Sequence, residues 1–300
     1  MPDLLLLLPD FALILIGHVI CKHTALNRTV WDGAERLVYF VLFPALLFIS
    51  IVRQPMQLNT LAQLGGLGLA ISAVGVALAY ALRYAPGVDP LLHASGAQTA
   101  FRFNSYVALA LAERIAGPQG LAWLALLVAV CVPVINVAAV LPLARHGGHK
   151  LLKELARNPL ILATLAGLLT NLSGLKLPDL ATITLSRMGA AALPLGLMAV
   201  GSGLRFGALR EAPWLAAALL AIRHAVLPLT AIALVIALHL PPLQQAVIVA
   251  FAAMPTAGSA YVLAVRMGGH GAYVAGLVTV STLLAMVGLP AALGLLALLR

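Results

Sequence analysis

An apolar segment around residues 250–264 is long enough, with its flanks, to cross a bilayer, yet its middle holds Pro255, Thr256, Gly258 and Ser259. Proline removes a backbone donor and clashes with the preceding helical turn, and glycine weakens a helix. Freed backbone groups find no water in lipid, so such a break persists only inside the protein or beside a wet cavity. Secondary transporters use broken helices of this kind to hold a solute. The segment therefore predicts an interrupted membrane helix with a solute beside it.

The composition is that of a membrane protein. Hydrophobic residues make up 62% of the chain and charged residues 9%, whereas soluble domains have roughly 45–50% and 25%. A soluble fold could not hide so much apolar surface, so we expect an all-α protein that crosses the membrane many times. Cys21 and Cys131 suggest neither a disulfide framework nor a metal site.

A membrane-spanning helix needs about 20 mostly apolar residues. This rule predicts ten spans, at 4–21, 34–52, 61–83, 91–115, 119–143, 158–175, 181–204, 213–238, 242–266 and 271–299. The fourth span is the weakest by hydropathy, because it contains Gln98, Arg102, Asn104 and Ser105. We retain it as a span because the ninth is interrupted in a similar way.

The polar loop 146–157 divides this single transporter domain into a first half, 1–145, and a second half, 158–300. Spans two and seven both carry an internal proline, Pro44 and Pro194, and spans four and nine both carry a polar interruption. An odd number of spans in each half inverts one half relative to the other in the membrane, which is a recurring transporter plan. The pattern predicts two inverted five-helix repeats.

Basic residues set the expected orientation, because cytoplasmic loops gather Lys and Arg. With the N-terminus outside, the loops outside the cell contain only Arg53, Arg114, Lys176 and Arg300, and most of the 18 basic residues lie inside. Both termini are then periplasmic. The net charge of +9 reflects this topology, and it is not evidence for nucleic-acid binding.

Ionisable groups inside a membrane are functional candidates, because an Arg at a helix centre costs roughly 2.5–3.5 kcal/mol. The groups expected within spans are mostly basic: Arg102, Arg187, Arg223, His224 and His18. Among the acids, only Asp10 and Glu113 are expected to reach inward. A cavity lined in this way attracts anions. It is poorly equipped to hold Na⁺ on carboxylates, although backbone carbonyls could still bind it.

Arg102 and Asn104 are the leading pair of candidate substrate-binding residues. They would lie on different helix faces, so they share a site only if the helix is unwound there. A half-helix starting near Ser105 would aim free N–H groups and its positive end at the gap. In span nine, Thr256, Gly258 and Ser259 would do the same. In the alternative interpretation, Arg102 snorkels to an interface and Asn104 caps a helix.

The remaining candidates have equally good structural interpretations. Tyr106 and Tyr261 could close a cavity or pack at a helix crossing, and Asn136 could bind a ligand or join two helices. Pro255 is expected to break its helix rather than contact substrate. For Arg223 and His224 we favour lipid phosphate binding or helix anchoring.

Several motifs together resemble the auxin efflux carrier family, which includes bacterial permeases for malate or malonate. They are YFVLFPALLF at 39–48, RFNSY at 102–106, NP at 158–159, MPTAGSAYVLA at 254–264, MGG at 267–269 and VTVSTLL at 278–284. The resemblance covers essentially the whole chain. It implies ten helices and a fold like the sodium/proton antiporters and bile-acid symporters. Spans four and nine would be broken and cross near Asn104 and Pro255, and a panel of spans one, two, six and seven would face this core.

Two departures from the family pattern matter. Many relatives have a proline after the asparagine in span four, whereas Ser105 follows Asn104 here, so this span must open by other means. The chain also lacks the long cytoplasmic loop of plant auxin carriers, which makes auxin a poor candidate substrate.

These observations predict a bacterial inner-membrane carrier that moves a small organic anion, a mono- or dicarboxylate such as malate or malonate, by alternating access. Its partners are that substrate and membrane lipid, not nucleic acid. No cofactor or metal is expected, and a homodimer is left open. An anion channel or a small-molecule receptor is the alternative. An intramembrane enzyme is less favoured, because the chain lacks His-Glu-x-x-His, paired intramembrane aspartates and aspartate-rich motifs.

Overall fold

The computed structural model describes residues 8–53, 58–144, 159–204 and 209–299. These ranges are almost entirely helical and contain no strand, which confirms the all-α class. Six helical stretches in them are long and apolar enough to cross a bilayer: Arg28–Val52, Ala62–Tyr84, Ser105–Leu143, Asp179–Ser202, Pro213–Ala237 and Gly271–Leu298. The loop 146–157 and Arg300, on which part of the predicted topology depends, lie outside the described residues.

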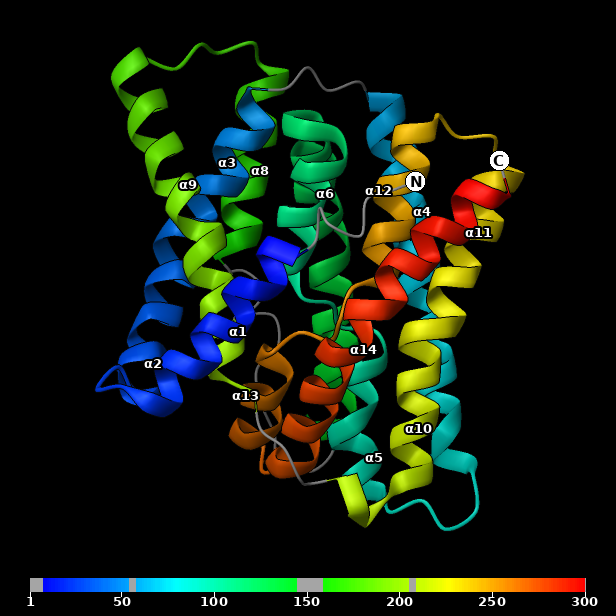
Figure 1. Cartoon of the computed structure of the whole chain (residues 1–300). Coiled ribbons are helices and arrows are strands. Elements are labelled where there is room, and N and C mark those ends of the chain that lie inside the picture. Colours follow the sequence, from blue (N-terminus) through cyan, green and yellow to red (C-terminus); the bar gives the residue numbers. More distant parts are fainter. Residues whose placement is uncertain (1–7, 54–57, 145–158, 205–208, 300) are drawn as a thin grey trace.

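The described residues of the first half form six α-helices and three short helical turns (Figure 1). They are α1 Leu8–His23, α2 Arg28–Leu37, the π-helical turn η2 Val38–Leu42, α3 Phe43–Val52, α4 Leu58–Ala81, η3 Leu82–Tyr84, α5 Pro90–Gly96, η4 Ala97–Ala100 and α6 Ser105–Ala144. α2, η2 and α3 form one continuous helix. It begins earlier than the predicted residue 34, because the Asn27 side chain accepts from Thr29 N at 3.0 Å and caps it at Arg28.

The turn between the fourth and fifth predicted spans lies inside α6. Ala116 and Gly117 are non-helical there, and Gly117 has a φ of 56° that favours glycine. A Cβ on Gly120 would lie 2.2 Å from the carbonyl oxygen of Ala112, so the segments before and after the turn pass very close together.

The second half is also largely helical in its described residues (Figure 1). Its elements are α8 Pro159–Leu172, α9 Asp179–Ser202, η5 Leu209–Glu211, α10 Pro213–Ala221, the π-helical turn η6 Ile222–Val226, α11 Leu227–Ala237, α12 Pro242–Ala253, α13 Ser259–Arg266 and α14 Gly271–Leu298. α12 and α13 together occupy the predicted ninth span and are separated by residues 254–258.

The helices form two groups. α1, α2, α3, α8 and α9 pack on one another, and we call them the panel bundle; α4, α5, α6 and α10–α14 form the core bundle. Figure 1 shows the panel bundle at the left and most of the core bundle at the right, with α6 between them. α6 contacts α3, α8 and α9 as well as α4 and α12, so it forms the main interface between the groups.

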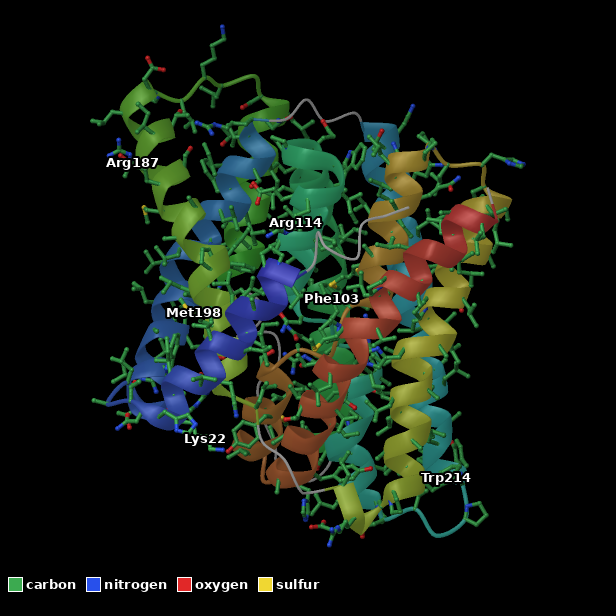
Figure 2. All side chains as sticks on the ribbon, in the orientation of Figure 1. Lys22, Phe103, Arg114, Arg187, Met198 and Trp214 are labelled. Atoms are coloured by element: carbon green, nitrogen blue, oxygen red, sulfur yellow. The ribbon has the colours of Figure 1, made fainter. Side chains whose placement is uncertain are left out.

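Glycines allow α1 and α9 to cross closely. A Cβ on Gly201 would lie 1.7 Å from the carbonyl oxygen of Ile14, and one on Gly17 would lie 2.0 Å from that of Met198. Small residues let membrane helices approach in this way. Met198 lies at this crossing in Figure 2.

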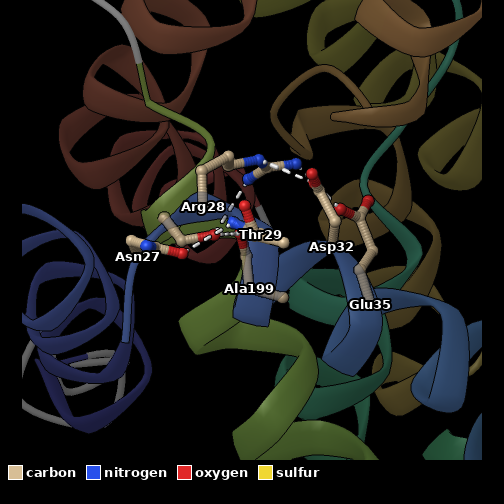
Figure 3. A network of polar contacts seen from close by, with 7 residues as sticks. Asn27, Arg28, Thr29, Asp32, Glu35 and Ala199 are labelled. Carbon is tan, nitrogen blue, oxygen red and sulfur yellow. Dashed lines mark hydrogen bonds and ion pairs between the residues drawn. The ribbon is translucent and has the colours of Figure 1, made fainter. Parts of the chain in front are cut away.

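A polar network joins α2 to α9 at the lower end of the panel bundle (Figure 3). Arg28 forms ion pairs with Asp32 at 2.8 Å and Glu35 at 3.1 Å, and Arg28 Nη1 donates to Ser202 Oγ at 2.9 Å. The Glu35 side chain is only 32% exposed. The prediction that only Asp10 and Glu113 reach inward was therefore wrong about Glu35, because its carboxylate pairs with Arg28, which also bonds to α9. Glu113 is exposed. The structure does not describe the Asp10 side chain.

Candidate functional site

The fourth and ninth predicted spans are both unwound, at residues 101–104 and 254–258, and the two unwound segments cross each other. Phe103 and Thr256 form an antiparallel β-bridge. Asn104 N donates to the carbonyl of Pro255 at 2.8 Å, and Ala257 N donates to that of Arg102 at 3.3 Å. Figure 2 places Phe103 near the centre of the molecule, and we call this region the crossing.

This pairing explains how the first break persists without a proline. Backbone groups that leave a helix inside an apolar protein need other partners. Here the partner is the opposite unwound segment, whose own break contains Pro255. The ring of Phe103 also packs edge-on against Phe251, with centroids 4.7 Å apart. Each break therefore supplies the hydrogen bonds that the other lacks.

Thr256 belongs to the framework of the crossing. Its hydroxyl donates to the carbonyl of Thr99 at 2.7 Å, its backbone N–H donates to Ser281 Oγ at 2.8 Å, and its side chain is fully buried. Gln98 Nε2 adds a bond to the carbonyl of Ala260 at 3.1 Å. These donors are directed at the protein itself, so Thr256 serves to hold the two breaks together.

Asn104 is the N-cap of α6. Its Oδ1 accepts from Tyr106 N at 3.0 Å and from Val107 N at 3.3 Å, so the capping interpretation is correct for this atom. The residue is only 2% exposed. Its Nδ2, however, has no hydrogen-bond acceptor within the described part of the chain. Leaving a buried donor unsatisfied costs about 1–3 kcal/mol. The amide therefore leaves one buried donor without an acceptor among the described residues at the crossing.

Arg102 lies on the other side of the same break. Its Nη1 donates to Gln98 Oε1 at 2.8 Å and its Nη2 donates to Ser259 Oγ at 2.9 Å. None of the ion pairs in the described ranges involves Arg102. Ser259 is the first residue of α13, so the guanidinium lies beside a positive helix end. A cation next to such an end favours an anion nearby.

The other candidates have different positions. Ser105 is the half-buried first residue of α6, and Gly258 precedes α13 with open space around the position of a Cβ. Tyr261 packs beside Gly271 at the start of α14. Asn136 lies half-buried in the later part of α6 and is not among the residues that hold the crossing together.

A cavity of about 590 Å³ separates α1, α3 and α9 of the panel bundle from α6. Its walls are mostly apolar, and its polar lining residues are Ser50, Arg53, Glu113, Arg114 and Ser186. Figure 2 shows Arg114 toward the upper part of α6. Of these residues, Arg53, Glu113 and Arg114 are exposed. The cavity thus carries its charges at its exposed end.

An aromatic pair adjoins the inner end of this cavity. The rings of Tyr106 and Phe43 have centroids 4.5 Å apart, and a Cβ on Gly196 would lie 2.4 Å from the Tyr106 ring. The lining residues Ala110 and Leu46 lie one helical turn or less further along α6 and α3, on the same helices as these rings. Tyr106 therefore packs at a helix crossing, where it also lies between the cavity and Asn104.

Arg223 is a residue whose role the sequence analysis misjudged. It is 2% exposed, and its guanidinium donates to three backbone carbonyls at the end of α12. Of the two favoured interpretations, lipid phosphate binding was therefore wrong, because the side chain points into the core bundle, where it holds the end of α12. The signal available in the sequence was an Arg in the middle of an apolar span, shortly before Pro228. The π-helical turn that changes the direction of its side chain is seen only in the structure.

A family model described as membrane transport protein matches residues 89–293. The match runs from the N-cap of α5 into α14 and includes both unwound segments. This chain belongs to the membrane transport protein family. A search of curated proteins found no match. Membership in this family confirms the resemblance to the auxin efflux carriers and agrees with a transporter rather than an enzyme.

Proposed function

We propose that this member of the membrane transport protein family is a secondary carrier of a small organic anion, a mono- or dicarboxylate of the size of malate or malonate. The observation that supports this most is the unpartnered Nδ2 of the buried Asn104 at the crossing. A carboxylate oxygen is a strong acceptor for such a donor. Arg102 and the positive ends of α6 and α13 supply the complementary charge.

The substrate would reach this site by alternating access. We propose that the cavity between the panel bundle and α6 is the path from one side, and that the Tyr106–Phe43 pair separates it from Asn104. Movement of the core bundle against the panel bundle would then expose the crossing to one side and afterwards to the other. Rigid movement of one bundle around a fixed site is a common carrier mechanism.

The finer architecture belongs to the same proposal. We count α1 and α8 as spans and divide α6 at its internal turn. The part of α6 before the turn joins α5 as one interrupted span, and α12 and α13 form the other. Counted in this way, the described helices fit ten membrane crossings in two inverted repeats. The breaks then fall in the fourth crossing of each repeat. Such pairs of interrupted helices in corresponding positions point to the binding site of a transporter.

A ligand screen on the purified protein tests the proposed function. Thermal unfolding would be followed across mono- and dicarboxylates, their amides and organic cations, each with and without Na⁺. Ligands that bind only the folded state raise the unfolding temperature. We expect stabilisation by at least one small carboxylate and none by its neutral amide. Stabilisation by cations alone would contradict an anion carrier, and flux that neither saturates nor shows counterflow would identify a channel.

We expect both termini on the periplasmic side of a bacterial inner membrane, because this orientation leaves few basic residues outside. In Figure 1 the C-terminus lies at the same end as the connections from α8 to α9 and from α11 to α12. A reporter fused after residue 299 should behave as periplasmic, and one inserted in the loop 146–157 as cytoplasmic. A cytoplasmic signal from the C-terminal fusion would contradict ten crossings with this orientation.

A further inference from the structure

The π-helical turn η6 directs two consecutive residues toward the unwound segment that follows α12. Arg223 Nε donates to the carbonyl of Met254 at 2.6 Å, and its Nη2 donates to those of Ala252 at 3.0 Å and Phe251 at 3.2 Å. His224 Nε2 lies 2.8 Å from Ser281 Oγ, which accepts from Thr256 N. The same turn of helix therefore contacts the break in two ways. Arg223 bonds to carbonyl groups before Pro255, and His224 contacts Ser281, which accepts from the N–H of Thr256.

The carbonyls that Arg223 binds need a partner. The last four C=O groups of any helix lack an intrahelical donor, and together they form the negative end of the helix. α12 ends at Ala253, deep in the protein, where these carbonyl oxygens are shielded from water. In carriers with broken helices, such ends and unwound carbonyls commonly coordinate Na⁺ or a proton. In this protein a guanidinium fills that position.

The Arg223 charge is not explained by an acidic partner. No ion pair in the described ranges includes Arg223, and its side chain is almost completely buried. A buried charge is costly unless polar groups compensate it. Three backbone carbonyls at a negative helix end supply that compensation. The guanidinium therefore occupies a position among carbonyl oxygens like that of a bound monovalent cation.

We propose that Arg223 is a built-in cation that stands in for a coupling ion at the C-terminal end of α12. The carbonyls of Phe251, Ala252 and Met254 then form a latent site for a monovalent cation, which opens only when the guanidinium is removed. Anion carriage by the unaltered protein is consequently independent of Na⁺. This last consequence rests on the proposed carrier function, whereas the latent site does not.

The test measures thermal unfolding of the purified full-length protein in NaCl, KCl or choline chloride at equal ionic strength. The unaltered protein should unfold at the same temperature in all three. Arg223→Ala should unfold several degrees lower in choline, and Na⁺, K⁺ or methylguanidinium should restore part of that loss. Choline is too large to enter a space vacated by a guanidinium. Arg187→Ala, which removes an exposed Arg from α9 (Figure 2), is the matched control and should show neither effect.

Two conservative variants keep the proposal falsifiable if Arg223→Ala fails to fold. Arg223→Lys retains a cation near the carbonyls and should keep most of the stability, whereas Arg223→Gln retains only hydrogen bonding and should behave like Arg223→Ala. If Lys restored no more than Gln, the fork shape rather than the charge would matter, and the proposal would be wrong. The same unfolding temperature of Arg223→Ala in NaCl, KCl and choline chloride would also overturn it, because no small cation would then occupy the vacated site.

Uptake separates this proposal from the proposed function. If the unaltered protein carries a carboxylate but requires Na⁺, Arg223 does not replace the coupling ion, while the carrier function stands. If no carboxylate is carried and the cation-specific recovery of Arg223→Ala is nevertheless observed, the latent site stands and the carrier proposal fails. Radioactive sodium should bind purified Arg223→Ala and not the unaltered protein, and binding to both or to neither would contradict the latent site.

Discussion

Replacing Asn104 with alanine is expected to lower the affinity for the transported anion by roughly 10–100-fold, which corresponds to the about 1.5–3 kcal/mol of a hydrogen bond to a charged group. The reason is that alanine removes Nδ2, the buried donor that has no protein partner among the described residues. The measurement is substrate binding and initial uptake by protein reconstituted into liposomes, together with the unfolding temperature of each variant.

Loss of the cap must be separated from loss of the donor. Alanine also removes Oδ1, which caps α6 through Tyr106 N and Val107 N, and such a loss costs about 0.5–2 kcal/mol of stability. Asn104→Asp is the matched control, because it keeps a capping oxygen and replaces the donor with an acceptor. We expect Asp to preserve folding and to abolish anion uptake. Wild-type uptake by the Asp variant would mean that Asn104 acts only as a cap.

The sequence was a good guide to one break and a partial guide to the other. Pro255 and Gly258 weaken a helix by local chemistry, so residues 254–258 could be predicted to unwind without knowledge of the fold. Residues 101–104 contain neither proline nor glycine. Their unwound conformation depends on the backbone bonds of Arg102 and Asn104 to Ala257 and Pro255, which are far away in the chain. Periodicity and composition carry no information about such pairing.

The side-chain positions of Arg223 and Glu35 were misjudged for a similar reason. For Arg223, lipid phosphate binding was one of the two favoured interpretations, because hydropathy places a residue along a span but does not say which way it faces. A π-helical turn changes the register of the helix just there, and the side chain points at the end of α12 instead. Glu35, at the start of the predicted span 34–52, was not expected to reach inward, because the sequence does not show that its partner Arg28 lies against α9. For Arg223 the missing information was its tertiary partner, and for Glu35 it was the contact between Arg28 and Ser202 of α9.

Replacing Arg102 with glutamine is expected to raise the apparent KM for a monocarboxylate about 10-fold and for a dicarboxylate about 100-fold. Glutamine keeps part of the length and hydrogen bonding toward Gln98 and Ser259 but removes the positive charge beside α13. A 10-fold change corresponds to about 1.4 kcal/mol, which is about a third of the roughly 4 kcal/mol between two unit charges about 4 Å apart at an effective dielectric constant of about 20, as suits a guanidinium that already bonds to Gln98 and Ser259. This energy scales with the charge of the ligand. The logarithm of the fold-increase in KM should therefore about double for a dianion.

Paired kinetics on two substrates make this prediction discriminating. Uptake of a monocarboxylate and of a dicarboxylate of similar size would be measured for the unaltered protein, Arg102→Gln, Arg102→Lys and the control Arg187→Gln, whose Arg is exposed on α9 and does not line the cavity. The Lys variant keeps the charge and should retain most of the preference for the dianion. Equal losses for both substrates in Arg102→Gln would show that the residue orders the crossing without attracting the substrate. Unchanged kinetics would place the anion away from Arg102, and the site would then have to be sought nearer Asn104 and the positive end of α6.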